Sequence, residues 1–585
     1  MLDEKIIALQ KALEQNDLDV YYMNSSDYHM SEYVPAYFRT IAYFSGFTGS
    51  VATLIVDKEK AYIFVDGRYH IQADKQCLVN GIEVIKLGTV GALDPLEFII
   101  KNYSDKIIGL DGKRTSIYFA NKLLQKGLTI KSIDIYSDLI VDRVPLVDTE
   151  LFKLADKFTG ETRKAKLEKV KYCLGGKTHV ITNLESIAYL LNLRGNDIAY
   201  TPVFLSYLVF YQNEVYLFID LERLTSDTLE ELYEDGVAIK PYNEYYNFLE
   251  GIENQVVLLD EHKVNYESMI RLSKHRNKVL HMTSIVEDLK AIKNPIEIDN
   301  AIQANIYDGV SMLRFLKWID EADKEELNEY SVLEKLNSFR LDYKAFDLSF
   351  NPIVAYNQNA AMMHYAPTLQ DNARLKNEGI LLIDSGGQYG EGTTDITRTI
   401  ALGEVSDEVK KHFTIVLKSM FNLSSAKFLE GTTGQKIDIL ARKDIWELGI
   451  DYRCGTGHGV GQTLSVHEGP PNIRYANTET KSETVPFKPG HIVTDEPGIY
   501  LEGKYGIRCE NMLLVVKDEL NDYGQFLRFK TLTMCPFDLR LVDKKYLDQR
   551  TIDLLNDYHK EVYNTLAPYL SEDEKSYLKE VTREI

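Results

Sequence analysis

The stretch ILLIDSGGQYGEGTTDITRTIAL, Ile380–Leu402, is the part of the chain that says most about its fold. Two apolar runs flank a Gly-rich turn, and this pattern predicts neighbouring antiparallel strands. Asp384 ends the first run, and Asp395 lies eleven residues later, where the second begins. The turn therefore brings two carboxylates onto adjacent strands, an arrangement suited to binding a cation.

Three more possible metal ligands follow along the chain: His458 in GTGHGVG, Glu496 in TDEPGIY and Glu510 in GIRCEN. Seen singly, an acidic residue beside Gly or Pro is an ordinary turn residue, and a histidine between glycines is more often a loop histidine than a ligand. Glu510 is less ordinary, because a carboxylate in an apolar strand needs a partner or a metal. Four carboxylates and one imidazole together predict a pair of divalent cations, which carboxylate oxygen can bridge.

Two further histidines and one arginine are candidates for contact with a substrate. His364 lies in NAAMMHYAP, and His467 lies in SVHEGP, nine residues after His458. Either histidine is explained about equally well by a hydrogen-bonded loop position and by proton transfer near the metals. Arg398, three residues after Asp395, suits either the orientation of a ligand carboxylate or a solvated position on the strand.

The composition excludes several classes of protein. The 585 residues are 44% hydrophobic and 26% charged, an ordinary globular balance for about three domains. The net charge of −21 argues against nucleic acid and anionic membranes as partners, and no run of about 20 apolar residues predicts a membrane span. The five cysteines form no C-x-x-C pair and the N-terminus lacks a signal-peptide core, so we expect a reduced cytoplasmic protein.

An internal repeat indicates two tandem α/β domains, which we place at residues 1–155 and 156–290. Two pairs of similar segments support it, with comparable separations within each copy. The pairs are AYIFVD at Ala61–Asp66 with VYLFID at Val215–Asp220, and IIGLD at Ile107–Asp111 with VVLLD at Val256–Asp260.

The third region, residues 291–585, opens with a clear helix start. Asn294 is a suitable N-cap, Pro295 suits the first helical position, and Glu297 completes a capping box. From about residue 380 the pattern changes to strands separated by Gly-rich turns, and a helical extension is predicted from about residue 538. This region is therefore expected to be an α+β domain with a helical tail, and its Tyr-rich tail suits either an oligomer interface or core helices.

Longer motifs resemble aminopeptidase P, also called Xaa-Pro aminopeptidase, a family of pita-bread metallopeptidases. The resemblance covers essentially the whole chain, and three segments outside the metal site point to the long, three-domain branch of that family. They are ESIAYLLNLRGNDIAYTPVFLSY at Glu185–Tyr207, LKAIKNPIEI at Leu289–Ile298 and TLTMCPFDLRLVD at Thr531–Asp543. The resemblance implies two creatinase-like α/β domains before a pita-bread catalytic domain, and commonly a homodimer.

The resemblance also implies roles for the candidate residues. The metal ligands, for two ions that in this family are usually Mn²⁺, would be Asp384 on one metal, Asp395 and Glu510 as bridges, and His458 and Glu496 on the other. Glu496 would also help to deprotonate the bridging water. His364 and His467 would contact the substrate carbonyl or carry protons.

Cys454 departs from the family pattern. It lies four residues before His458, where many relatives have a histidine close to the substrate. The change concerns substrate contact and leaves the metal site intact. A small neutral side chain is the more ordinary interpretation of Cys454, and a reactive thiol is the alternative.

The function implied by the resemblance is removal of the N-terminal residue from peptides with proline at position two. The first alternative is prolidase, which uses a similar site but accepts only dipeptides; the two extra domains and the C-terminal extension favour the aminopeptidase. A second alternative is a non-catalytic peptide- or histone-binding pita-bread protein. The presence of all five ligands argues against it.

Overall fold

The computed structural model describes residues 3–146, 149–478 and 480–585. These residues form two compact units. The first unit contains the described residues up to 155 together with 161–287, and the second contains 156–160 and 288–585. The sequence boundary expected near 290 lies close to this division. The boundary near 155 and the assignment of three domains stay predictions.

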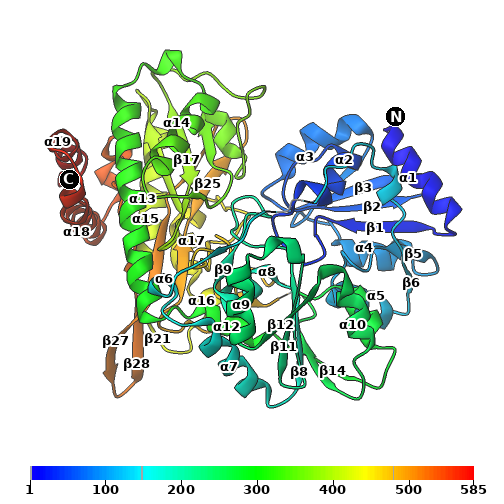
Figure 1. Cartoon of the computed structure of the whole chain (residues 1–585). Coiled ribbons are helices and arrows are strands. Elements are labelled where there is room, and N and C mark those ends of the chain that lie inside the picture. Colours follow the sequence, from blue (N-terminus) through cyan, green and yellow to red (C-terminus); the bar gives the residue numbers. More distant parts are fainter. Residues whose placement is uncertain (1–2, 147–148, 479) are drawn as a thin grey trace. The chain divides into compact units, whose positions relative to one another are not determined.

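The first unit holds two six-stranded sheets with the same plan (Figure 1). The first has the order β4-β3-β2-β1-β5-β6 and the second β12-β11-β10-β8-β13-β14. The strands of the first are β1 Val20–Asn24, β2 Thr53–Asp57, β3 Ala61–Val65, β4 Glu83–Lys86, β5 Ile107–Leu110 and β6 Thr129–Ser132. Those of the second are β8 Thr178–Ile181, β10 Tyr207–Tyr211, β11 Glu214–Ile219, β12 Val237–Pro241, β13 Val256–Leu259 and β14 Lys278–His281.

The predicted repeat is confirmed by strand positions. Strands β3 and β11 occupy the same place in their sheets, as do β5 and β13. In each sheet the central strand pairs antiparallel with one neighbour and parallel with the other. The similar segments in the sequence are thus equivalent strands of two copies of one α/β plan, as expected for tandem creatinase-like domains.

Alternating burial explains why helices cover both faces of the first sheet. Leu54 packs with α1 (Glu4–Gln15) and α2 (Thr40–Ser45), whereas the next residue, Ile55, packs with α4 (Pro95–Asn102) and α5 (Ile117–Gln125) on the other face. Successive strand residues point to opposite sides, so a strand that is apolar throughout must be covered twice. The other helices of this unit are α3 His70–Cys77, α7 Arg163–Leu174, α8 Leu184–Leu191, α9 Ser226–Glu234, α10 Tyr245–Glu250 and α11 Tyr266–Leu272.

The second unit begins with the long helix α13, Pro295–Glu321, whose predicted start is confirmed. Asn294 Oδ1 accepts hydrogen bonds from the backbone N–H groups of Ile296 and Glu297, and Glu297 Oε2 accepts one from the Asn294 N–H. Helix α12, Ile285–Ala291, precedes α13, and the remaining helices are α14 Glu329–Leu341, α15 Asp407–Ser424, α16 Gly434–Ile437, α17 Ile439–Trp446, α18 Gln549–Leu566 and α19 Glu572–Val581.

A short piece of chain from between the two tandem sheets also belongs to the second unit. It is α6, Asp156–Thr159, and it lies against the start of α13. Asn294 Nδ2 donates to the Thr159 carbonyl at 2.8 Å, and Asn300 Nδ2 donates to the Lys157 carbonyl at 2.8 Å. The second unit is therefore built from two separate stretches of sequence.

Two antiparallel sheets form the body of the second unit. One has the order β16-β17-β20 and the other β21-β28-β27-β24. Their strands are β16 Ile353–Tyr356, β17 Ile380–Ser385, β20 Ile396–Ala401, β21 Lys427–Leu429, β24 Ile492–Asp495, β27 Asn511–Asn521 and β28 Gly524–Thr531. Shorter strands make smaller pairings: β15 Asp347–Leu348, β18 Gly387–Tyr389, β19 Gly392–Thr393, β22 Gly457–His458, β23 Asn472–Ile473, β25 Gly498–Leu501 and β26 Tyr505–Arg508.

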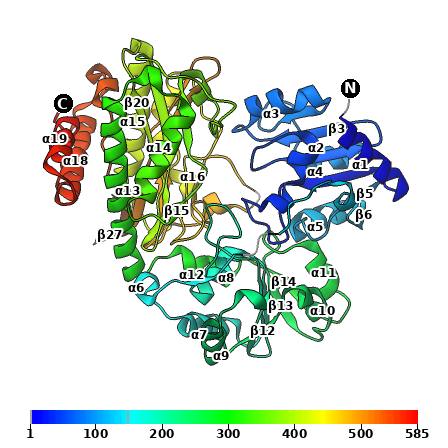
Figure 2. The ribbon, with the colours of Figure 1, turned by 45° about the horizontal axis from the view of Figure 1, so that its top comes forward.

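The C-terminal helices α18 and α19 lie along α13 (Figures 1 and 2). Leu555, Tyr558 and Val562 of α18 are buried in the same apolar core as Phe413 of α15. The inner face of the tail is therefore core helix, as one of the two sequence interpretations proposed. Among the described residues, no helix combines the length and apolar character that a membrane crossing would need.

Candidate metal centre

The two aspartates of the Gly-rich stretch lie on neighbouring strands, as the sequence predicted. Strands β17 and β20 pair antiparallel, with Asp384 opposite Thr397 and Ser385 opposite Ile396. Asp395 directly precedes β20. The connection is more elaborate than a simple hairpin, because β18 and β19 leave this sheet and pair with β15 instead.

Three of the candidate ligands come together closely. One ligand atom each of Asp395, His458 and Glu510 lies within 4.8 Å of the others. His458 Nε2 is 3.4 Å from Asp395 Oδ2 and 3.6 Å from Glu496 Oε1. These residues meet at strand ends: Asp395 directly precedes β20, His458 ends β22, Glu496 directly follows β24 and Glu510 directly precedes β27.

The local sequence explains how His458 reaches this point. A Cβ on Gly457 would lie 2.0 Å from the carbonyl oxygen of Thr494, and one on Gly459 would lie 2.0 Å from that of Glu468. Only glycine on both sides allows the histidine segment to lie this close to the backbone of β24 and of the loop that follows His467. The His458 Nδ1 contacts the Gly459 carbonyl at 3.0 Å, which leaves Nε2 toward the carboxylates.

Burial and mutual repulsion dominate the electrostatics of the cluster. Burial, together with Asp395 and Asp384, raises the pKa of Glu510 well above its usual range. Burial likewise raises the pKa of Asp384 to about 6. Burial opposes protonation of His458, but the contact with Asp395 and the charge of Glu496 outweigh it and raise its pKa to about 9. Without a cation the site therefore holds protons that a bound metal would displace.

Arg508 is a site residue that the sequence reasoning missed. It lies two residues before Glu510 and is 3% exposed. Its Nη2 donates to Asp384 Oδ2 at 2.5 Å, and its Nη1 donates to the Tyr500 hydroxyl at 2.6 Å. Thr397, also missed, donates to Glu510 Oε2 at 2.7 Å. Both residues stand beside predicted ligands, but nothing in the sequence distinguished them from ordinary strand residues.

The two candidate histidines neighbour different members of the candidate ligand set. The ring of His467 lies edge-on to His458, with ring centroids 4.4 Å apart. His364 follows Met363, whose carbonyl accepts a bond of 3.5 Å from the Arg508 Nη2 that also holds Asp384. Both imidazoles are half-buried. The His467 ring therefore contacts a candidate ligand, and the backbone beside His364 is bonded to the arginine that holds Asp384, while the roles of both histidines stay a prediction.

Arg398 is placed differently from the expectation of substrate contact or a solvated strand position. It is 1% exposed, and its guanidinium donates to the carbonyls of Glu510 at 2.6 Å and Cys535 at 2.7 Å. It also donates to the Tyr558 hydroxyl at 2.9 Å and stacks over the Phe537 ring at 3.9 Å. We therefore propose a structural role for Arg398, in which it joins the C-terminal extension to the backbone of a candidate ligand.

Cys454 is half-buried, and all five cysteines are unpaired. Burial and the charge of Glu496 raise the pKa of the Cys454 thiol to about 12. At neutral pH it is therefore a neutral thiol, which supports the interpretation as a small side chain over that of a reactive nucleophile.

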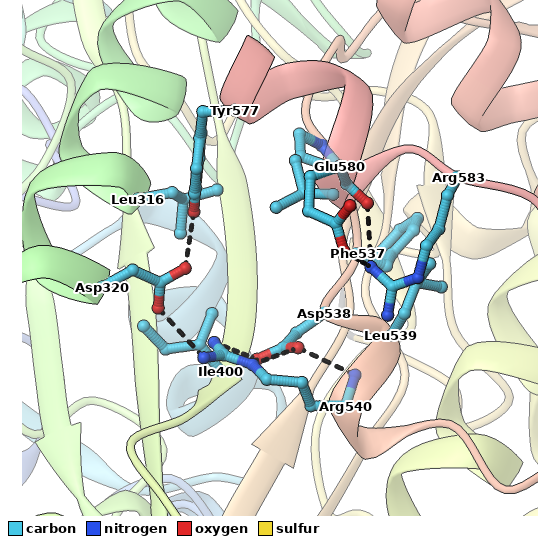
Figure 3. A pocket seen from close by; sticks show the side chains of 12 residues that line it. Leu316, Asp320, Ile400, Phe537, Asp538, Leu539, Arg540, Tyr577, Glu580 and Arg583 are labelled. Carbon is cyan, nitrogen blue, oxygen red and sulfur yellow. Dashed lines mark hydrogen bonds and ion pairs between the residues drawn. The ribbon is translucent and has the colours of Figure 1, made fainter. Parts of the chain in front are cut away.

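A separate cavity of about 220 Å³ lies under the C-terminal extension (Figure 3). Arg540 bridges Asp538 at 2.7 Å and Asp320 at 3.1 Å, and the Tyr577 hydroxyl donates to Asp320 at 2.7 Å. The charged groups that line this cavity are thus paired with one another, and its apolar lining includes Phe537. This cavity offers no cluster of free carboxylates, in contrast to the ligand set around Glu510.

The residues of the main cluster fit divalent cations. Asp384 Oδ1 is buried without a hydrogen-bond partner, although buried carboxylate oxygens are normally paired. Carboxylate and imidazole donors suit borderline or hard cations. A cation bound among them would satisfy this oxygen and offset the repulsion that raises the pKa of Glu510.

Comparison with known proteins supports the same interpretation. The sequence model of metallopeptidase family M24 matches residues 300–517, and that of the C-terminal region of peptidase M24 matches 525–585. Two models of the creatinase/prolidase N-terminal domain match residues 5–142 and 142–297. Together these matches extend over almost the whole chain.

Relatives match the chain over nearly its whole length and over nearly all of their own. The chain is 36% identical to a probable Xaa-Pro aminopeptidase P of Coprinopsis cinerea, over 100% of this chain and 98% of the relative. It is 34% identical to Xaa-Pro aminopeptidase 1 of Dictyostelium discoideum, over 97% and 94%. The crystal structure of X-prolyl aminopeptidase from Caenorhabditis elegans, described as a cytosolic enzyme with a di-nuclear active site, superimposes with a TM-score of 0.93 at 31% identity, over 100% of this chain and 99% of that one.

Proposed function

Because this chain belongs to the Xaa-Pro aminopeptidase P family of M24 metallopeptidases, we propose that it releases the N-terminal residue from peptides with proline at position two. The proposal rests on one observation: ligand atoms of Asp395, His458 and Glu510 lie within 4.8 Å of one another. The chain that carries them matches the C. elegans enzyme along its entire length. A metal-dependent hydrolase needs such a buried group of acidic and imidazole ligands.

We propose that the metal centre holds a pair of Mn²⁺ ions. Asp384 would hold one ion, His458 and Glu496 the other, and Asp395 and Glu510 both. When bound, the pair supplies Lewis acidity for the scissile carbonyl and lowers the pKa of a water molecule into the neutral range. The neighbouring C. elegans structure, whose active site is di-nuclear, supports this count.

The residues of the chain itself complete the proposed chemistry. Glu496 accepts a proton from the attacking water. His364 and His467 donate hydrogen bonds to the carbonyl oxygen as it gains negative charge, and one of them can pass a proton to the leaving nitrogen. The proline nitrogen offers no N–H for recognition, so the fit of the ring in its pocket must provide specificity. Cys454 is proposed to lie near that substrate.

The first experiment is hydrolysis of Arg-Pro-Pro by metal-stripped protein before and after addition of Mn²⁺. We expect manganese-dependent release of arginine. Asp395→Ala and Glu510→Ala are expected to lose both metal and activity. Normal metal content and turnover in either variant would contradict the ligand assignment.

Prolidase is the second candidate function, because it shares the metal site. A side-by-side assay of an Xaa-Pro dipeptide and the tripeptide separates the two, and hydrolysis of the dipeptide alone would favour prolidase. A folded protein that binds no Mn²⁺ would instead favour a non-catalytic peptide-binding role. We further propose a homodimer acting in the cytoplasm, consistent with the cytosolic description of the C. elegans enzyme; sedimentation analysis tests the dimer.

A further inference from the structure

A buried glutamate, Glu329, holds the segment that carries His364. It is the first residue of α14 and is 0% exposed. The segment begins where β16 ends at Tyr356, forms a short 3-10 helix at Asn357–Ala361, and then runs without regular structure to Ala373. A stretch of this kind needs bonds from outside itself to keep one conformation.

Glu329 supplies these bonds at four points along the segment. Its Oε1 accepts the N–H of Tyr356 at 2.6 Å and Nδ2 of Asn359 at 3.0 Å. Its Oε2 accepts the Tyr365 hydroxyl at 2.7 Å and the N–H of Ala373 at 2.6 Å. One carboxylate therefore fixes the entry, the first turn, the residue next to His364 and the exit.

The four hydrogen bonds and the position of Glu329 at a helix start both act against the cost of burying its charge. All four donor groups are neutral, so Glu329 holds the segment by hydrogen bonds alone and not by an ion pair. The carboxylate also lies at the N-terminus of the 13-residue helix α14, where the helix dipole favours a negative charge. Burial raises the pKa of Glu329, whereas the hydrogen bonds from the segment lower it, so these bonds offset part of the cost of burying the carboxylate.

The same segment also contacts β26, which ends two residues before the candidate ligand Glu510. A Cβ on Gly506 of β26 would lie 1.8 Å from the Ala360 carbonyl oxygen, so the segment lies directly on this strand. Two residues along the same strand, Arg508 links the Met363 carbonyl to Asp384. The backbone on either side of His364 is therefore held between Glu329 and the ligand set.

We propose that Glu329 is a positioning residue for His364: it fixes the segment that carries this imidazole and thereby sets where the imidazole meets the substrate. The inference rests on the proposed function for its catalytic consequence. It assigns no contact between Glu329 and the substrate. The effect of changing Glu329 must then pass through His364.

Glu329→Gln is the sharpest variant, because it keeps the size of the side chain. The amide NH₂ that replaces one carboxylate oxygen would face N–H and O–H donors. Tyr365→Phe is a milder companion that removes one bond and leaves Glu329 unchanged. Glu334→Gln, at an exposed position of the same helix, is the matched control.

The first readout is amide hydrogen exchange over residues 357–372, followed by mass spectrometry. We expect Glu329→Gln to raise exchange there about tenfold or more, with the peptides that contain Asp384 and Glu510 unchanged and bound Mn²⁺ retained. Tyr365→Phe should give a smaller increase, and Glu334→Gln none. Unchanged exchange in both Glu329→Gln and Tyr365→Phe would overturn the inference, whatever the activity.

The second readout is turnover of Arg-Pro-Pro with Mn²⁺. Glu329→Gln should lower kcat about 10- to 100-fold, but less than twofold when His364 is already alanine. Independent, multiplying effects of the two changes would overturn the positioning role, because a merely structural residue would act in both backgrounds. Absence of Xaa-Pro hydrolysis by the unmodified enzyme would overturn the proposed function, and with it the catalytic part of this inference, while the exchange readout still decides whether Glu329 holds the segment.

Discussion

Replacing Arg398 with methionine should strongly destabilise the second unit. The buried guanidinium donates to the backbone carbonyls of Thr397, Glu510, Cys535 and Pro536. Methionine fills much of the space but donates no hydrogen bond, so four buried carbonyls lose a donor. At about 1 kcal/mol for each lost bond, the free energy of unfolding should fall by about 4 kcal/mol.

This magnitude converts into a measurable melting shift. For a unit of this size, 1 kcal/mol changes the melting midpoint by about 2 °C, so the transition of the second unit should fall by about 8 °C. Calorimetry is the suitable assay, because a chain of two compact units need not unfold in one step. Arg528→Met is the matched control: the Arg528 side chain is 50% exposed, and its loss should change the midpoint by about 1 °C or less.

Arg398→Met should also weaken metal binding, because the Glu510 carbonyl loses its anchor. Groups that orient metal ligands typically contribute about 10- to 100-fold to metal affinity. We therefore expect the Kd for Mn²⁺ to rise by at least about tenfold. A melting midpoint within about 2 °C of the unmodified protein, together with unchanged Mn²⁺ affinity, would refute the structural role assigned to Arg398.

Three further outcomes are expected. Lys293 and Glu468 form a buried ion pair at 2.6 Å, so Lys293→Met should lower the free energy of unfolding by about 3–5 kcal/mol. An unchanged melting curve would show that Lys290, 3.5 Å from Glu468, is a sufficient partner by itself. The pKa values of His458 (about 9) and Asp384 (about 6) are raised, so both groups hold protons that a metal must displace. Mn²⁺ affinity should therefore increase as the pH rises from about 6 to 9. Calorimetry in buffers of different ionisation enthalpy should detect the released protons. Tyr577→Phe removes one bond at the C-terminal cavity and should lower stability by about 1 kcal/mol without changing Mn²⁺ binding; loss of metal in this variant would contradict the separation of the two sites.

Local signals in the sequence predicted much of the fold. The capping box at Asn294 and the apolar runs around Asp384 and Asp395 involve residues within a few positions of one another, so their physics is visible in the order of the residues. The candidate ligands were singled out by equally local signals, because each stands beside a glycine, a proline or an apolar strand, and their role as metal ligands stays a prediction.

The remaining features depend on contacts between distant parts of the chain. Arg398 looked like a strand residue facing solvent or substrate, and its burial depends on carbonyls more than a hundred positions away. Glu329 accepts hydrogen bonds from the N–H groups of Tyr356 and Ala373, which lie 27 and 44 positions later in the sequence. No sequence motif connects these three positions. Such partners become evident only when the backbone is in place.

The division of the second unit between two stretches of sequence has a consequence for synthesis on the ribosome. Residues 156–160 emerge before the whole of 161–287, and the rest of their own unit begins only at residue 288. At roughly 5–20 residues per second, α6 waits about 7–29 s before its partners Asn294 and Asn300 are synthesised. During that time Phe158, whose ring will pack against Gly390, has no place to be buried within its own unit. The first unit must therefore fold while residues 156–160, which interrupt its sequence, still lack the rest of their own unit. Expression of residues 288–585 alone would produce a second unit without α6.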